Sequence, residues 1–174
     1  MIGPPGAGKT TVGALVAAQL GLDFVDADTF IEEAAGKPVS DIFVQDGEDA
    51  FRALERAAAA RLISSHPGVV ALGGGAILDP GTRELLAGRR VVYLETGFAS
   101  AVHRTGLDSP RPLLFGNPRG RMKVLLEERL PVYTALAWIT VPTDDRKPED
   151  IAREIAVRLA PGGGNGHGPS ASRP

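Results

Sequence analysis

Residues 3–10 of this 174-residue chain read Gly3-Pro4-Pro5-Gly6-Ala7-Gly8-Lys9-Thr10, and they are the strongest indication of its fold. It matches the pattern G-x-x-x-x-G-K-[ST] in full. In such loops the glycines let backbone N–H groups point inward and cradle phosphate oxygens. The lysine reaches the β- and γ-phosphates, and the hydroxyl after it ligates Mg²⁺. A helix from about Thr11 would add the positive end of its dipole. The stretch therefore predicts a site for ATP and Mg²⁺ formed by Gly6, Ala7, Gly8, Lys9, Thr10 and Thr11.

Beyond this loop, helical and extended patterns alternate along the chain. The apolar spacing predicts helices at about 11–20, 48–64 and 148–159, and short apolar strands at 22–25, 69–72, 91–94 and 138–141. On the helix at 48–64, we expect Phe51, Leu54, Ala58 and Leu62 to share one face. Such alternation is typical of an α/β fold in which helices cover both faces of a parallel sheet.

The strand that should lead into the phosphate loop is short. Only Met1 and Ile2 precede Gly3, whereas strands average about 5–6 residues. A central parallel strand pairs on both edges and is buried on both faces. We therefore expect the first strand to be truncated in this sequence, with its remaining residues encoded upstream.

Composition narrows the possible functions. The formal net charge is -2, so no strong positive field indicates a nucleic-acid partner. The chain has 0 cysteines, which excludes disulfides, thiolate metal sites and cysteine nucleophiles. No apolar run is long enough to cross a bilayer and no leader pattern opens the chain, so we expect a cytoplasmic protein without a membrane partner. Residues 1–160 are interpreted as one domain and residues 161–174, rich in glycine, as a disordered tail.

One segment interrupts the alternation at about 105–120. It is rich in glycine and proline, carries basic residues, and is too long for an ordinary connection. Long loops of this kind are often active-site lids, although a surface excursion is the simpler alternative. Arg104, Arg111 and Arg129 lie in or beside it, and the planar fork of arginine suits phosphate and carboxylate groups.

Three further features lie at or near the ends of the predicted strands at which a parallel sheet binds its ligands. Asp26 and Asp28 end the predicted strand that begins at residue 22, where two carboxylates could bind Mg²⁺ and an acceptor hydroxyl. Asp28 is also a good helix cap. The run Gly73-Gly74-Gly75 follows a strand and allows a ligand to approach the backbone closely. Arg52 is either a solvated helix residue or the partner of Glu55 three residues later.

Taken together, these residues resemble the shikimate kinase family from Gly3 to about Leu159. The phosphate loop is shared by many families, but the order of the other motifs is specific. These motifs are Asp26-Ala27-Asp28, Ser40-Asp41-Ile42-Phe43, Gly47-Glu48, Phe51-Arg52-Ala53-Leu54-Glu55, Leu72-Gly73-Gly74-Gly75-Ala76, Arg111-Pro112-Leu113-Leu114 and Arg129-Leu130-Pro131-Val132-Tyr133.

The resemblance implies a P-loop NTPase fold of the nucleoside-monophosphate-kinase type. Such a fold has three α/β/α layers around a five-stranded parallel sheet, whose first strand is truncated here, with a lid at about 105–120 and a substrate-binding helical segment at about 27–55. It also implies a single kinase domain, mostly monomeric in this family. The implied reaction transfers the γ-phosphate of ATP to the 3-hydroxyl of shikimate, giving shikimate 3-phosphate and ADP in aromatic amino-acid synthesis.

The resemblance also assigns roles to residues. Asp28 would contact the shikimate hydroxyls and act as the base, while Asp26 would help to hold Mg²⁺ through water. The remaining assignments are a carboxylate clamp (Arg52, Arg129), a ring-lining run (Gly73, Gly74, Gly75), contact with the transferred phosphate (Arg111), stacking on adenine (Arg104) and the adenine-binding loop (Arg146, Pro148).

Three alternatives remain open from the sequence. A gluconate-type kinase on the same fold would share the loop and lid but should lack the pairing of Arg52 and Arg129 with the glycine run. A GTPase-like switch would need an Asn-Lys-x-Asp sequence, which this chain does not contain. A kinase-like protein that binds ATP without turnover is disfavoured by the intact Lys9, Thr10 and acidic pair.

Overall fold

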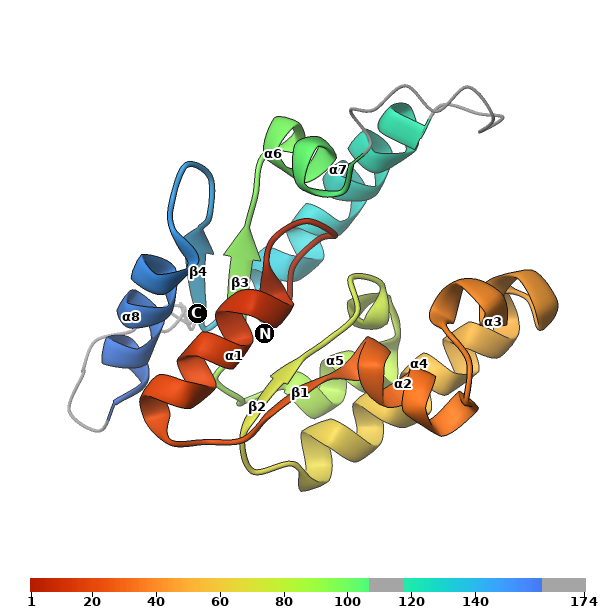
Figure 1. Ribbon diagram of the computed structural model, residues 1–174, viewed down its shortest axis with the longest axis horizontal. Coiled ribbons are helices and arrows are strands. Elements are labelled where there is room, and N and C mark those ends of the chain that lie inside the picture. The colour runs from red at the N-terminus through yellow and green to blue at the C-terminus, as the bar shows by residue number, and fades with distance from the viewer. Residues whose placement is uncertain (107–117, 161–174) are drawn as a thin grey trace, which may run out of the picture.

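The computed structural model describes residues 1–106 and 118–160, which alternate between helices and short strands (Figure 1). Most of the predicted lid, including Arg111, and the predicted tail at 161–174 lie outside the described residues. The helices are α1 (Lys9–Leu20), α2 (Ala27–Ala35), α3 (Val39–Gln45), α4 (Glu48–Ser65), the 3-10 turn η1 (Ala76–Leu78), α5 (Pro80–Leu86), α6 (Phe98–Arg104), α7 (Pro118–Leu136) and α8 (Pro148–Leu159). The strands are β1 (Phe24–Asp26), β2 (Val69–Ala71), β3 (Val92–Glu95) and β4 (Ile139–Pro142).

The strands form two parallel pairs rather than the continuous five-stranded sheet that was predicted. β1 pairs with β2, and β3 pairs with β4. The truncated first strand lies between the pairs. The Ile2 N–H donates to Val92 O at 2.9 Å, and the Leu94 N–H donates to Ile2 O at 2.9 Å. On the other side, the Leu72 N–H donates to Met1 O at 3.0 Å. Two residues are too few to be counted as a strand, yet they connect both pairs.

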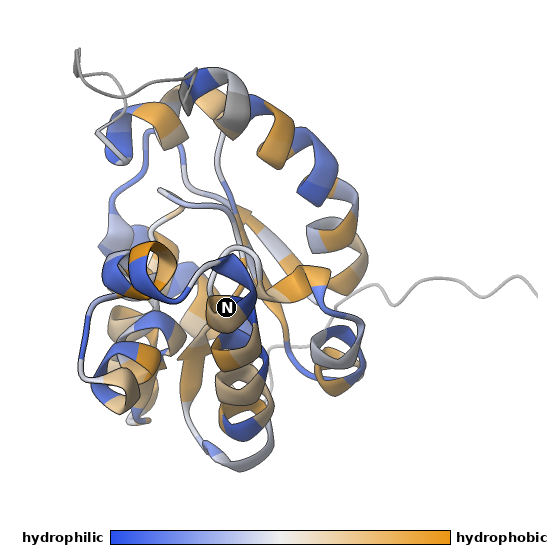
Figure 2. Ribbon diagram, turned by 90° about the vertical axis from the view of Figure 1, so that its right-hand side faces the viewer, coloured by the Kyte–Doolittle hydropathy of each residue, from blue (hydrophilic) through white to orange (hydrophobic). Residues whose placement is uncertain are grey.

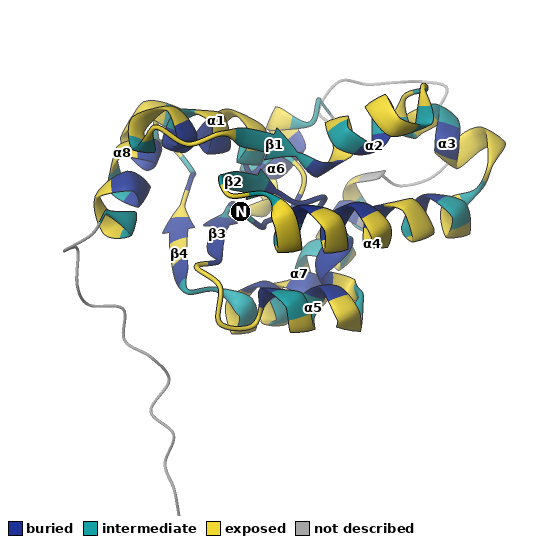
Figure 3. Ribbon diagram, turned by 90° about the horizontal axis from the view of Figure 1, so that it is seen from below, coloured by how far each residue is buried: buried dark blue, intermediate teal, exposed yellow. Residues whose placement is uncertain are grey.

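Helices cover both faces of these strands, as an α/β fold requires (Figure 3). One core joins α1 and α8 to the β3–β4 pair and includes Val16, Leu94 and Ile155. A second core joins α4, α5 and α7 to the other face and includes Leu62 and Tyr133. Apolar residues concentrate on the central strands in Figure 2, whereas the helices around them carry both polar and apolar residues. The three-layer prediction is therefore confirmed.

Local sequence signals located the ends of the three helices and four strands that were predicted. α1 ends where Gly21 adopts φ 64° and donates its N–H to the carbonyls of Ala17 and Ala18. α8 begins with Pro148 in its first turn, as predicted. The four predicted strands agree with β1–β4 to within two residues. No helix in the described part of the chain is long and apolar enough to cross a membrane.

One prediction about the buried face of α4 is wrong. Leu54 is 40% exposed, and Glu55 is only 5% exposed and occupies the buried stripe with the other three predicted residues. A carboxylate is stable there because Glu55 is paired with Arg52. Hydrophobic spacing alone could not show that a charged residue takes a core position.

The buried amino terminus predicts a pH-dependent stability. The Met1 ammonium donates to Val70 O, and its burial, together with the nearby charge of Lys9, lowers its pKa from 8.0 to about 5. Between these values the unfolded chain binds more protons than the folded chain, so the free energy of unfolding rises as pH rises from about 5 to 8. Urea unfolding across this range would measure the rise, with the Nα-acetylated chain as control. An equal pH dependence in the acetylated chain would contradict this origin.

Candidate active site

The phosphate loop follows Ile2 and passes close to its neighbours. Gly3 has φ 150°, and a Cβ placed there would lie 2.6 Å from Leu94 O. Gly6 has φ 79°, and a Cβ placed there would lie 2.9 Å from Ala101 O in α6. Neither position accepts a larger residue without moving backbone. The loop glycines therefore allow close packing as well as the exposure of N–H groups.

Lys9 lies over this loop as the pattern predicts. Its Nζ donates to Gly3 O at 2.9 Å and to Pro4 O at 3.1 Å. Burial lowers the pKa of Lys9, while the charges of Asp28 and Asp26 act in the opposite direction. The side chain is thus a desolvated cation facing two carboxylates, which is a suitable setting for binding phosphate oxygens.

The acidic pair is arranged differently from the prediction that both aspartates end a strand. Asp26 ends β1 and caps α2, since its Oδ1 accepts the Asp28 N–H at 3.0 Å. Asp28 lies in the first turn of α2, so the cap is Asp26 rather than Asp28. The second oxygen of Asp26 accepts the Thr10 hydroxyl at 2.6 Å. The predicted metal-binding pair, Thr10 and Asp26, is therefore in direct contact.

This pair fits Mg²⁺ in its donor chemistry. Mg²⁺ prefers oxygen ligands, keeps several waters, and is usually held by one or two carboxylates together with substrate phosphates. The structure shows no group of three or more His, Cys, Asp or Glu side chains suited to a metal within residues 1–106 and 118–160. A hydroxyl and one carboxylate beside a phosphate loop are consistent with that partial shell.

Asp28 lies in the first turn of α2, beside the glycine run. Partial desolvation of its carboxyl raises its pKa, and the negative charges of Asp26, Glu55 and Glu32 act in the same direction, while Lys9 opposes them. A Cβ on Gly73 would lie 3.0 Å from Asp28 Oδ1. Asp28 is therefore held between the phosphate loop and the glycine run.

Arg52 is fixed from several sides. Its Nη1 donates to Glu55 Oε2 at 2.7 Å, and its Nη2 donates to Glu48 Oε1 at 3.1 Å. Its guanidinium carbon lies 5.4 Å from the Phe51 ring centroid and 6.0 Å from that of Phe43. The ion pair with Glu55 that the spacing allowed is confirmed, and Arg52 is not a freely solvated residue.

Glu55 is the residue that the site prediction missed. A Cβ on Gly73 would lie only 2.7 Å from Glu55 Oε1, so this carboxylate reaches both Arg52 and the glycine run. The available signal was position: Glu55 lies four residues after Phe51 and three before Ala58, on the buried stripe of α4. A carboxylate on a buried stripe indicates a partner.

The run Gly73-Gly74-Gly75 is the point at which the acceptor-side residues meet. Arg129 Nη1 donates to Gly74 O at 3.0 Å, and the Tyr133 hydroxyl donates to the same oxygen at 2.6 Å. A Cβ on Gly75 would lie 2.4 Å from Arg52 Nη1. The two predicted clamp arginines, from α4 and α7, therefore both reach one short glycine segment.

The predicted nucleotide residues line a separate cavity of about 460 Å³ beside the phosphate loop. Arg104 donates to Thr143 O at 2.7 Å and to Thr143 Oγ1 at 3.0 Å, which holds its guanidinium at the cavity. Arg146 is paired with Glu154 at 2.7 Å. The lining residues include the loop from Gly6 to Thr11 and the predicted set Arg104, Arg146 and Pro148.

The structure thus joins a nucleotide cavity, a phosphate loop and an acidic pair to a cluster of arginines around the glycine run. A partly buried lysine and carboxylates near these arginines suit the transfer of a phosphoryl group to an anionic small molecule. Together with the α/β fold, they define a P-loop kinase.

The comparisons with known proteins identify the family. The family model for shikimate kinase matches residues 5–160. A shikimate kinase of Thermobifida fusca is 61% identical over 163 residues, covering 94% of this chain and 95% of that protein. One from Salinispora arenicola is 52% identical over 160 residues, covering 92% of this chain and 96% of that protein. The chain belongs to the shikimate kinase family.

Solved structures agree with this result. A shikimate kinase from Acinetobacter baumannii in complex with shikimate is similar at a TM-score of 0.82 and 40% identity, covering 90% of this chain and 88% of that one. The shikimate kinase of Aquifex aeolicus is similar at a TM-score of 0.77 and 31% identity, covering 91% and 93%.

Proposed function

We propose that this chain transfers the γ-phosphate of ATP to the 3-hydroxyl of shikimate, giving shikimate 3-phosphate and ADP in aromatic amino-acid biosynthesis. The observation that carries the proposal is the placement of Arg52 and Arg129 against the same glycine run, with Asp28 beside it. This arrangement suits an acceptor that carries both a carboxylate and a hydroxyl. The Acinetobacter baumannii relative, solved in complex with shikimate, supports the choice of acceptor.

On the acceptor side, Arg52 and Arg129 bind the shikimate carboxylate through charge-assisted hydrogen bonds. Gly73, Gly74 and Gly75 let the ring approach the backbone. Asp28 orients the 3-hydroxyl and accepts its proton as the oxygen bonds to the γ-phosphorus. The bond between that phosphorus and the bridging oxygen breaks, and its electron pair stays on ADP.

On the donor side, the N–H groups of the phosphate loop and Lys9 hold the phosphates, and Thr10 and Asp26 would hold Mg²⁺, the latter through water. When bound, Mg²⁺ neutralises negative charge on the β- and γ-phosphate oxygens. Arg111, which lies outside the described residues, is proposed to face the transferred phosphate. Arg104 is proposed to stack on adenine, beside the loop with Arg146 and Pro148.

The setting of the reaction is also a proposal. We infer that the protein works as a cytoplasmic monomer, without nucleic-acid or membrane partners. The support is its formal net charge of -2, its lack of cysteine and the usual state of the family. The single kinase domain at 1–160, the lid at 105–120 and the tail at 161–174 stay predictions.

A coupled assay that detects ADP tests the proposed function. Shikimate, gluconate and nucleoside monophosphates are each offered with ATP and Mg²⁺. We expect ADP only with shikimate, because the arginine pair requires a carboxylate and gluconate cannot place its hydroxyls on a rigid ring. Turnover with gluconate but not with shikimate would contradict the assignment, and binding of ATP without any turnover would favour a non-catalytic protein.

Lys9→Ala and Asp28→Asn should abolish turnover by different routes. Lys9 acts on the phosphates and Asp28 on the acceptor hydroxyl, so Asp28→Asn should keep most of the ATP affinity while Lys9→Ala loses it. Calorimetric titration with ATP measures the difference. Equal loss of ATP binding in both variants would be inconsistent with these roles.

Arg52→Ala and Arg129→Ala should chiefly weaken shikimate binding. Loss of a charged hydrogen bond costs about 1.5–3 kcal/mol, which corresponds to a roughly tenfold or larger rise in the shikimate KM. The KM for ATP serves as the internal control because neither side chain lines the nucleotide cavity. An unchanged shikimate KM in both variants would remove the carboxylate clamp from the mechanism.

Glu55→Gln tests whether the missed residue positions Arg52. Glutamine keeps the size of the side chain but removes the buried charge, so we expect the shikimate KM to rise roughly two- to tenfold with kcat and the ATP KM nearly unchanged. Glu48→Gln is the matched control. Glu48 bonds the same guanidinium, but its side chain is 66% exposed, against 6% for Glu55. The change in the shikimate KM caused by Glu48→Gln should therefore stay within about twofold. Equal rises in the shikimate KM for both variants would mean that the burial of Glu55 does not help to position Arg52.

A further inference from the structure

The loop between β4 and α8 holds α6 at both of its ends. At the end of α6, Arg104 donates to Thr143 O at 2.7 Å and to Thr143 Oγ1 at 3.0 Å. At the start, Asp144 Oδ2 accepts the Gly97 N–H at 2.9 Å, and Asp144 Oδ1 accepts the Thr96 hydroxyl at 2.8 Å. Two consecutive residues of one loop therefore fix both ends of a helix that is distant in sequence.

α6 needs this support because its own sequence provides little. The helix has only 7 residues, and isolated helices of this length are unstable. Its N-cap residue is Gly97, which has no side chain for capping. In a capping box, a side chain from the third residue of the helix accepts the N–H of the N-cap residue. Here the third residue is Ser100, and the carboxylate that accepts the Gly97 N–H comes from Asp144 instead.

The contact between Asp144 and the start of α6 is close. A Cβ on Gly97 would lie 2.8 Å from Asp144 Oδ2, so glycine at this position lets the carboxylate reach the backbone. Burial acts to raise the pKa of Asp144, but hydrogen bonds from Thr96, Gly97 and Ser100 and the charge of Arg104 hold it below its ordinary value. The start of α6 therefore favours the ionised carboxylate.

α6 also contacts the phosphate loop. A Cβ on Gly6 would lie 2.9 Å from Ala101 O and 3.3 Å from Thr105 Cγ2, and Arg104 Nη1 donates to Gly6 O at 3.4 Å. The helix thus lies between the phosphate loop and the loop that joins β4 to α8. Residues of both loops line the nucleotide cavity, and Arg104 lines it between them. Movement of α6 away from either loop would carry Arg104 with it.

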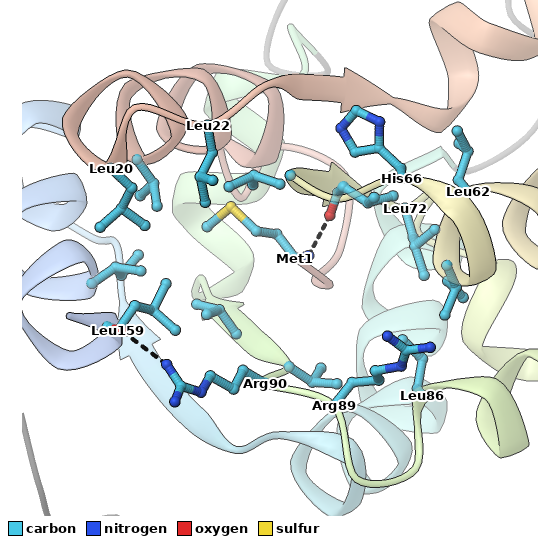
Figure 4. Close-up of a pocket in the computed structure, with 18 residues that line it drawn as sticks. Met1, Leu20, Leu22, Leu62, His66, Leu72, Leu86, Arg89, Arg90 and Leu159 are labelled. Carbon is cyan, nitrogen blue, oxygen red and sulfur yellow. Dashed lines mark hydrogen bonds between the residues drawn. The ribbon is translucent and has the colours of Figure 1, made fainter. Parts of the chain in front are cut away.

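The loop that holds α6 is itself firmly attached to the core. The Thr143 N–H and the Thr143 hydroxyl both donate to Glu95 O, at 2.9 Å and 3.0 Å. At the far end of α8, Arg90 donates to Leu159 O at 2.8 Å (Figure 4). Between these points α8 packs against α1 and the β3–β4 pair in one apolar core. The hydrogen bonds of Asp144 therefore connect α6 to a fixed part of the fold.

We propose that Asp144 is a positioning residue for the nucleotide, which clamps the start of α6 to the loop between β4 and α8 and thereby places Arg104 in the nucleotide cavity. Asp144 is not among the described residues that line this cavity, so it acts through α6. The guanidinium of Arg104 is then held at two levels, directly by Thr143 and indirectly by Asp144. The inference rests on the proposed role of Arg104 toward adenine, and it does not involve the acceptor site.

The test measures ATP affinity by calorimetric titration with Mg²⁺ and without an acceptor. Asp144→Ala removes both acceptor oxygens, and we expect the Kd for ATP to rise roughly three- to tenfold. Asp144→Asn keeps an oxygen for the Gly97 N–H, and its amide can donate to Thr96 Oγ1, so most of the affinity should return. Thr96→Val removes one hydrogen bond and should raise the Kd less than Asp144→Ala.

Asp145→Asn is the matched control for loss of a negative charge. Asp145 is the next residue of the same loop and is exposed, and asparagine tolerates its φ of 53°. Its ATP Kd should stay within about twofold of that of the unaltered chain. A Kd raised equally by Asp144→Ala, Asp144→Asn and Asp145→Asn would mean that only charge matters, which would overturn the clamp.

A double-mutant cycle separates positioning from a general loss of stability. Because Asp144 acts through Arg104, Asp144→Ala should add less than about twofold to the ATP Kd of Arg104→Ala. Hydrogen exchange should show weaker protection of the Ala101 amide, which bonds Gly97 O in the first turn of α6. Fully additive increases in Kd would mean that Asp144 does not act through Arg104.

The remaining outcomes are also decisive. An unchanged ATP Kd in Asp144→Ala, with or without a fall in Tm, would mean that Asp144 only stabilises the fold. Failure of the proposed function is seen separately. If the unaltered chain binds ATP but does not phosphorylate shikimate, the acceptor assignment is wrong, whereas the titrations still decide the role of Asp144. If the unaltered chain does not bind ATP, both proposals are wrong.

Discussion

The backbone hydrogen bonds of Met1 and Ile2 hold the two halves of this protein together. Met1 pairs with β2 and Ile2 pairs with β3, so within residues 1–106 and 118–160 these two residues supply the backbone hydrogen bonds that connect the β1–β2 and β3–β4 pairs. Ile2 is 1% exposed and belongs to the core under α4, α5 and α7. The phosphate loop begins at the next residue. Its position relative to the nucleotide cavity and to the glycine run therefore depends on these few bonds.

The glycine run fixes the arrangement of the acceptor side of the site, because the absence of side chains lets other groups pack directly against its backbone. Groups from α2, α4 and α7 approach Gly73, Gly74 and Gly75 so closely that a methyl group on Gly73 or Gly75 would meet Glu55, Asp28 or Arg52 within about 3 Å. Positively and negatively charged side chains consequently lie close together around the glycine run. Such a cluster has few ways to rearrange, and preorganised charge of this kind is the main contribution a protein makes to phosphoryl transfer.

Local patterns were sufficient for the fold class and for much of the site. The phosphate loop, the stop of α1 at Gly21 and the start of α8 at Pro148 depend on residues close in sequence, whose backbone preferences act without tertiary help. The Arg52–Glu55 pair was foreseeable for the same reason, since residues three apart on a helix are neighbours. Arg129 and the glycine run were also singled out from the residues, but only the family resemblance connected them, because no local pattern joins residues so far apart.

By itself, then, the sequence determined the α/β class, the phosphate site and the family, because these rest on short-range spacing and on residue order. Only the tertiary structure decided that Glu55 rather than Leu54 is buried on α4, since Glu55 pairs with Arg52 on the same helix and the opposing surface is the glycine run instead of an apolar layer. It also decided that Arg129 and Tyr133 share the Gly74 carbonyl, 55 and 59 residues away. The same is true of the two-residue link between the strand pairs. Such contacts join residues far apart in the chain, and they exist only after the helices have packed on the strands.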